Sequence, residues 1–237
     1  MTTTTGGVIE VQIPLEQATL DGDLVIPQSP RGLVIFAHGS GSSRKSPRNR
    51  YVARRLQEAD LATLLMDLLT PAEERADMMT GHLRFDIPFL AKRLRAATAW
   101  VRTRPDIAGL PVGYFGASTG AAAALVAAAE PRSSLRAVVS RGGRPDLAAS
   151  SLAGVEAPTL LFVGGRDRDV LEWNREALRL LRCEKELTVV PGASHLFEEP
   201  GTLEEVARLA AEWFRGHLDS LEWKPSPAEL SAPIRGE

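Results

Sequence analysis

The chain has 237 residues, of which 44% are hydrophobic, and it carries a formal net charge of −2 at pH 7. This length and composition favour one sizeable core over two small ones. The weak negative charge gives no sign of a nucleic-acid partner. No lysine or arginine precedes Arg31, and the apolar stretches before it are too short for a signal peptide or a membrane span. We therefore expect a cytoplasmic protein without nucleic-acid or membrane partners.

Apolar runs and helical stripes alternate along the chain, which is typical of a parallel sheet covered by helices on both faces. Two initial strands, 8–14 and 23–27, are expected to pair antiparallel around a turn at Asp21 and Gly22. The sequence predicts further strands over 32–37, 61–66, 111–115, 135–140, 159–163 and 187–190. It predicts helices over 47–59, 87–102 and 203–218, and one directly after Ser118. The prediction is an α/β fold with a mostly parallel, twisted sheet of about eight strands.

The domain organisation follows from the same pattern. Residues 1–220 are expected to form a single domain, and the proline-rich segment 221–237 is expected to be a loose tail. The one cysteine, Cys183, excludes an internal disulfide and is expected to be a small packing residue.

Residues 116–120 read Gly-Ala-Ser-Thr-Gly and lie between an apolar strand and an alanine-rich helix. A serine with glycines two residues away on each side can occupy a strained turn, because the strand and the helix cross at close range there. Such a turn exposes the Ser118 hydroxyl above the sheet. It also places the amide of Thr119 at a helix N-terminus, where it can stabilise a developing oxyanion. The pattern predicts Ser118 as a nucleophile.

An acid and a histidine follow in the chain order that a serine nucleophile of this kind requires. Asp167 lies just beyond the predicted strand 159–163, and His195 lies in the loop beyond the last predicted strand. Asp146 is an alternative acid because it follows the preceding strand. Three further histidines are rivals for the base: His38, His82 and His217. Of these, His38 is expected to order its own loop.

These motifs resemble those of the α/β-hydrolase superfamily, and in particular its small cap-less enzymes similar to dienelactone hydrolase. The resemblance spans residues 8–218. It implies a nucleophile at Ser118, an acid at Asp167 within a Gly-x-x-Asp-x-x-Val loop, and a base at His195. The His-Gly loop after strand 32–37 would supply a second oxyanion amide from Ser40, beside that of Thr119. Dienelactone hydrolases proper have cysteine at the nucleophile position, so serine here favours general ester hydrolysis.

The resemblance implies that small or unhindered carboxylic esters are cleaved through an acyl-enzyme, without a metal or organic cofactor. The protein is expected to be a monomer or a small homo-oligomer. An acyltransferase or thioesterase on the same three residues, and a non-catalytic binding protein with this fold, remain alternatives.

Three residues are candidate substrate contacts. Arg44 lies in a basic loop after the His-Gly motif, and Arg141 follows the strand next to that of the nucleophile. Either could attract an anionic group, although both could equally lie on a solvated face. Met79 lies in the long excursion 68–86, which either forms a partial wall over the site or is a solvated loop. The short connection 140–159 leaves little room for a lid, so we expect an open site.

Overall fold

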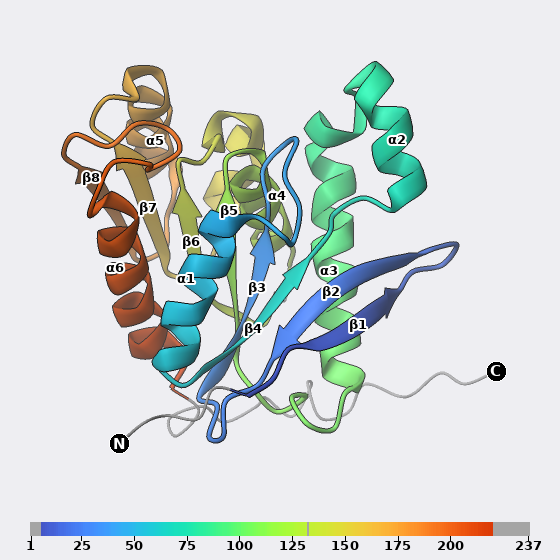
Figure 1. The fold of residues 1–237 in the computed structure, drawn as a ribbon. Helices are drawn as coiled ribbons and strands as arrows, with labels where there is room; N and C mark the ends of the chain where they lie inside the picture. The colour runs from blue at the N-terminus through green and yellow to red at the C-terminus, as the bar shows by residue number, and fades with distance from the viewer. Residues whose placement is uncertain (1–5, 132, 220–237) are drawn as a thin grey trace.

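The computed structural model describes residues 6–131 and 133–219, which form a three-layer α/β/α structure (Figure 1). Eight strands make one sheet in the order β1-β2-β4-β3-β5-β6-β7-β8. Strands β3 to β8 are parallel, whereas β2 pairs antiparallel with both β1 and β4. The strands are β1 Ile9–Pro14, β2 Thr19–Val25, β3 Gly32–Ala37, β4 Leu61–Met66, β5 Val112–Ala117, β6 Leu135–Arg141, β7 Thr159–Gly164 and β8 Lys185–Val190. The predicted fold class is confirmed, and the segment 221–237 lies outside the described residues.

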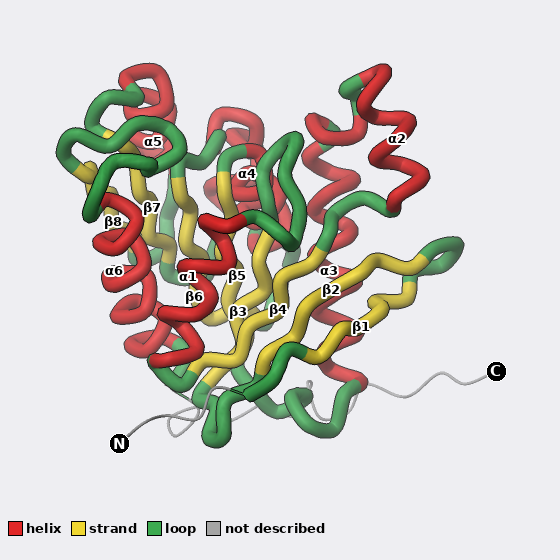
Figure 2. Tube along the Cα trace, in the orientation of Figure 1, coloured by secondary structure: helices red, strands yellow, loops and turns green. Residues whose placement is uncertain are grey.

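The helices cover the sheet from both sides, as the colouring of Figure 2 shows. One face packs against α1 and α6, and the other against α3, α4 and α5. The helices are α1 Pro47–Glu58, α2 Pro71–Thr80, α3 Ile87–Thr103, α4 Thr119–Ala128, α5 Arg168–Leu180 and α6 Thr202–His217, with 3-10 segments η1 Leu83–Phe85 and η2 Pro145–Gly154. The central strands β3, β4, β5 and β7 are buried along their whole length because helices cover both of their faces.

Helix α3 illustrates how the sequence pattern becomes packing. Its side chains at Ile87, Leu90, Leu94 and Val101 are all buried, at the spacing of three, four and seven that places residues on one face of a helix. The helix begins where the Asp86 carboxylate accepts a hydrogen bond from the amide of Phe89.

The first hairpin differs from the prediction. Asp21 and Gly22 lie inside β2, opposite Gln12 and Val11 of β1, and the turn lies instead at residues 15–18. A Cβ on Gly22 would lie 3.0 Å from Leu64 Cδ1, so the glycine serves close packing between strands. The Asp-Gly pair, a strong local turn signal, was therefore misleading here.

Among the residues that the structure describes, no helix is both long and apolar enough to cross a membrane.

Candidate active site

Ser118 occupies the sharp turn between β5 and α4, at the carboxyl end of the sheet. Its backbone angles are φ 50° and ψ −121°, a conformation that non-glycine residues rarely adopt. Ser118 is the N-cap residue of α4, yet its side chain makes no capping hydrogen bond. The hydroxyl is therefore available for chemistry instead of helix capping.

The two flanking glycines make this turn possible. A Cβ on Gly116 would lie 2.4 Å from Ala121 Cα, and a Cβ on Gly120 would lie 2.3 Å from the carbonyl oxygen of Ala37. Both distances are far shorter than any non-bonded carbon contact allows. The close approach of α4 to the ends of β3 and β5 thus requires glycine at both positions, as the sequence pattern predicted.

Asp167 and His195 are hydrogen-bonded to each other, with 2.6 Å between Asp167 Oδ2 and His195 Nδ1. Asp167 is the N-cap residue of α5, but its carboxylate caps no helix amide. Because the carboxylate accepts the Nδ1 proton, His195 Nε2 is left as the unprotonated nitrogen that can accept a proton. The alternative acid, Asp146, is bound instead through both oxygens to Arg144, at 2.9 and 2.7 Å.

The loop that carries His195 is fixed by its own neighbours. The Glu199 carboxylate accepts hydrogen bonds from the amide and the hydroxyl of Ser194, at 3.0 and 3.2 Å. Gly142, with φ 53°, lies so close that a Cβ there would be 3.6 Å from His195 Cε1. Phe197 is buried despite a φ of 55°. The hydrogen bonds to Glu199 fix the backbone directly before His195, and Gly142 places the end of β6 beside this loop.

Ser118 and His195 line one cavity of about 240 Å³, together with Ser40, Arg48 and Arg141. The cavity brings together a serine, a histidine with its carboxylate partner and two cationic side chains. Such a set can activate a hydroxyl for attack on a carbonyl. No group of three or more His, Cys, Asp or Glu side chains suited to a metal ion is present in the described parts of the chain.

The loop after β3 lies directly against Ser118. A Cβ on Gly39 would be 3.0 Å from Ser118 Cβ, and the amide of Ser40 donates to Thr119 Oγ1 at 2.9 Å. This hydroxyl contact was not predicted. For Ser40 to act as an oxyanion donor, a substrate oxygen must displace the Thr119 hydroxyl from the Ser40 amide. The oxyanion role of Ser40 and Thr119 stays a prediction.

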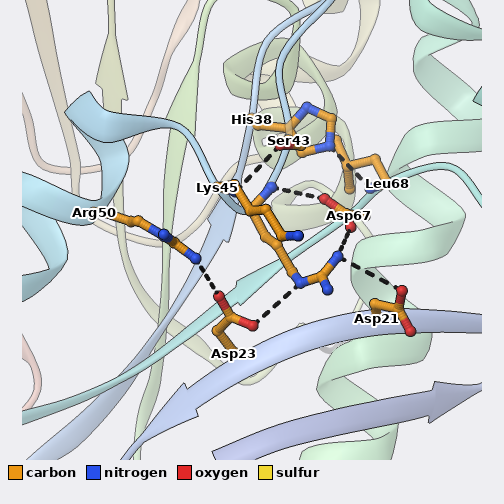
Figure 3. Close-up of polar contacts among 9 residues, drawn as sticks. Asp21, Asp23, His38, Ser43, Lys45, Arg50, Asp67 and Leu68 are labelled. Atoms are coloured by element: carbon orange, nitrogen blue, oxygen red, sulfur yellow. Dashed lines mark hydrogen bonds and ion pairs between the residues drawn. The ribbon is translucent and has the colours of Figure 1, made fainter. Parts of the chain in front are cut away.

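Arg44 does not face the cavity as a free cation, which corrects the expectation that it contacts substrate. Figure 3 shows the polar contacts around this loop. The guanidinium donates to Asp23 Oδ1 at 3.1 Å and also to the Asp67 carboxylate, and Asp21 lies 3.6 Å away. Burial disfavours the charge of Arg44, but its hydrogen bonds to Asp67 and Asp23 and their negative charges outweigh burial and raise its pKa. The residue ties the loop after β3 to β2 and β4.

His38 orders the same loop, as its position in the sequence predicted (Figure 3). Its Nδ1 lies 2.9 Å from the carbonyl oxygen of Gly39, and its Nε2 accepts the amide of Leu68 at 3.0 Å. Both bonds together require the neutral Nδ1–H form of the ring. Burial lowers the pKa of His38 below 6.5, against smaller opposing effects of the Gly39 carbonyl, Asp67 and Glu74.

The lowered pKa of His38 predicts an acid-sensitive contribution to stability. Between pH 6.5 and the folded pKa, the unfolded chain binds more protons than the folded protein, so the free energy of unfolding falls as the pH falls. We expect His38→Gln to flatten this part of the profile, measured by urea unfolding between pH 5 and 7.5. The matched control is His82→Gln, which replaces an exposed ring outside this loop. Equal slopes for wild type and His38→Gln would contradict the assignment.

The excursion 68–86 forms helix α2 and η1 and borders a second cavity, of about 170 Å³. A capping box between Thr70 and Glu73 starts the helix, and the buried Asp77 binds Arg84 at 2.5 Å. This cavity shares Gly39, Ser40 and Ser42 with the first, so α2 is a wall beside the proposed site and not a solvated loop. Met78 lines it.

The prediction for Met79 is corrected by the same helix. Met79 is 87% exposed and lies outside both cavities, because the next position on a helix points about 100° away. Only the register of α2 distinguishes the two methionines, and the sequence pattern did not predict that helix. The capping box of Thr70, Pro71 and Glu73 is the signal that could have found it.

Comparison with known proteins places these features in a family. The model described as "Dienelactone hydrolase family" matches residues 20–221. A crystal structure of dienelactone hydrolase from Anabaena variabilis is 59% identical over 90% of this chain and 98% of its own, with a TM-score of 0.88. Est1E from Butyrivibrio proteoclasticus shares the fold at 16% identity and a TM-score of 0.73, over 88% of this chain and 98% of its own.

Two proteins of Mycobacterium tuberculosis, strains CDC 1551 and H37Rv, are 62% identical over 88% of this chain. Both bear the name "Putative phosphoribosyl transferase". The chain spans about half the length of these curated relatives, 46%. The family match covers most of the chain. It agrees with the α/β fold and with the glycine-flanked turn at Ser118. The chain belongs to the dienelactone hydrolase family.

Proposed function

We propose that the protein hydrolyses carboxylic esters with small or unhindered acyl groups through an acyl-enzyme on Ser118. The observation that carries the proposal is the Asp167–His195 hydrogen bond beside a cavity that Ser118 and His195 share. In this mechanism His195 Nε2 takes the Ser118 proton as the hydroxyl oxygen attacks the acyl carbonyl. The imidazolium then protonates the leaving alcohol, and water hydrolyses the acyl-enzyme by the same route.

Asp167 is assigned a supporting role in this mechanism. Its carboxylate holds the Nδ1–H form of His195 and stabilises the transient imidazolium without becoming protonated. The developing oxyanion would be bound by the amide of Thr119 at the N-terminus of α4 and, once released from the Thr119 hydroxyl, by the amide of Ser40.

A fluorophosphonate probe tests the proposal without knowledge of the substrate, because it reacts with the activated serine itself. Wild type is expected to be labelled stoichiometrically at Ser118, as mapped by mass spectrometry of the modified peptide. Labelling is expected to disappear in Ser118→Ala and to fall sharply in His195→Ala, since the probe reacts only with an activated hydroxyl. No labelling of folded wild type would overturn the proposal in favour of a binding protein.

An acyltransferase or thioesterase would use the same groups and would differ in the acceptor that reaches the acyl-enzyme. Higher product yield with added alcohols, amines or thiols would identify it. The name of the M. tuberculosis relatives suggests phosphoribosyl transfer, but it belongs to proteins about twice as long as this chain. No feature in the described parts of the chain favours that reaction over ester hydrolysis.

A further inference from the structure

A buried arginine lies next to the proposed nucleophile. Arg141 is the last residue of β6 and pairs with Ala117 of β5, the residue before Ser118. Its carbonyl oxygen accepts the amide of Ser118 at 3.2 Å, and its side chain lines the cavity that contains Ser118 and His195. Only 7% of Arg141 is exposed.

The guanidinium of Arg141 has no carboxylate partner within residues 6–131 and 133–219. Its Nη2 donates to Asn49 Oδ1 at 3.2 Å, and its Nη1 is buried without a hydrogen-bond partner in the described part of the chain. This separates Arg141 from Arg44 and Arg144, which are both neutralised by aspartates. A buried charge that lacks a counter-charge destabilises the fold, so a purely structural role does not account for it.

A second cation lies in the same cavity. Arg48 reaches Glu198 through Nη1 at 3.1 Å, while its Nε is buried without a partner among the described residues. Burial, and next the repulsion from Arg48, lowers the pKa of Arg141 to about 10. The protein therefore holds two like charges in one cavity, and each of the two has an N–H group without a partner among the described residues. An anion placed between them would relieve the repulsion and accept those protons.

We propose that Arg141 and Arg48 form a subsite for an anionic group of the substrate, a carboxylate or a phosphate, beside the ester that Ser118 attacks. The inference rests on the proposed function and narrows it to esters that carry a negative charge close to the reacting carbonyl. It assigns Arg141 the role of a specificity-determining residue. Arg48, partly offset by Glu198, is the weaker of the two cations.

Matched esters that differ in charge test the subsite by kinetics. Monoethyl succinate against ethyl butyrate places the charge on the acyl side, and O-acetylglycolate against propyl acetate places it on the alcohol side. We expect wild type to prefer at least one charged ester, and Arg141→Met to lower kcat/KM for that ester by roughly 10- to 100-fold. The neutral partner is expected to change by less than about threefold, since it makes no ionic contact with Arg141. Arg104→Met, which removes an arginine bound to Asp106, is the control.

Thermal unfolding provides a readout that does not depend on turnover. Arg141→Met is expected to raise the Tm, because it replaces an unpaired buried charge with an apolar side chain of similar length. Inorganic phosphate, acetate or both are expected to raise the Tm of wild type, but not that of Arg141→Met. The anion that inhibits turnover of the preferred charged ester more strongly identifies the bound group as a phosphate or a carboxylate.

Either of two kinetic results for Arg141→Met would overturn the inference: an equal fall in kcat/KM for charged and neutral esters, or no fall for either charged ester. A lower Tm in Arg141→Met with no effect of anions on wild type would also overturn it, because the residue would then be structural. Fluorophosphonate labelling separates these failures from failure of the proposed function. If Ser118 is labelled and neutral esters are turned over, only the subsite is refuted; if wild type is not labelled, the proposed function fails first.

Discussion

Replacing Ser118 with alanine is expected to lower kcat for any ester substrate by at least roughly 10⁴-fold, because the proposed mechanism forms the acyl-enzyme on the Ser118 hydroxyl. The residual rate would come from binding and from oxyanion stabilisation alone. Ser118 keeps its strained backbone only because Gly116 and Gly120 permit the close packing around it. Alanine fits the same turn, so stability should change little and the loss should be confined to activity.

Ser118 and His195 are expected to lose activity together and not additively. His195→Ala is expected to cost nearly as much as Ser118→Ala, and the double variant no more than either alone, since the two groups act in one proton transfer. Initial rates with a neutral ester, together with urea unfolding of each variant, measure both effects. Ser150→Ala, in the exposed part of η2, is the control for an ordinary serine. Additive losses in the double variant would show that the two residues do not act as a unit.

The places of the proposed catalytic residues could be predicted because each depends on a local pattern. The glycine spacing around Ser118 reports a close crossing of strand and helix, and this requirement is met within five residues of sequence. Asp167 and His195 follow strands whose carboxyl ends meet at one edge of a parallel sheet. Because β7 and β8 are neighbours in the sheet, the loops that follow them place the two side chains together.

The polar surroundings could not be predicted in the same way. Arg44 and Arg141 both come after apolar runs in the sequence. In the structure Arg44 lies among aspartates, whereas Arg141 has no aspartate or glutamate partner among the described residues. The difference comes from Asp23 and Asp67, which reach Arg44 from strands distant along the chain. The pairing of a charge depends on tertiary neighbours, so sequence reasoning found the cations but not which of them was uncompensated.

Two local sequence patterns gave wrong or incomplete predictions of secondary structure, because tertiary packing decides the structure at those places. The Asp-Gly pair of β2 has the composition of a hairpin turn, but Leu20 and Leu24 on either side are both buried and keep the strand straight through it. Helix α2 was missed for the opposite reason. Only Asp77 is buried along its length, so it carries no apolar stripe to recognise.

Gly120→Ala is expected to destabilise the protein by about 3 kcal/mol or more, because the fold has no room for the added methyl group. A Cβ there would lie 2.3 Å from the carbonyl oxygen of Ala37 and 2.4 Å from that of His38. Both oxygens belong to the backbone, one at the end of β3 and one in the loop that holds Gly39 against Ser118. They cannot rotate away as a side chain would, so α4 must shift as a unit.

The matched control is Gly216→Ala in the last turn of α6, where a Cβ would meet no atom within 4 Å. Alanine has the higher helix propensity, so this variant is expected to gain up to about 1 kcal/mol. Urea unfolding of both variants, with fluorophosphonate labelling of the folded fraction, compares the two positions directly.

An unfolding free energy for Gly120→Ala equal to that of wild type would mean that α4 can move away from β3 without loss of stability. The strained turn at Ser118 would then need another explanation. A large loss of stability in Gly120→Ala beside a gain in Gly216→Ala would tie the strained backbone of Ser118 to the crossing of α4 and β3, since the two substitutions add the same methyl group.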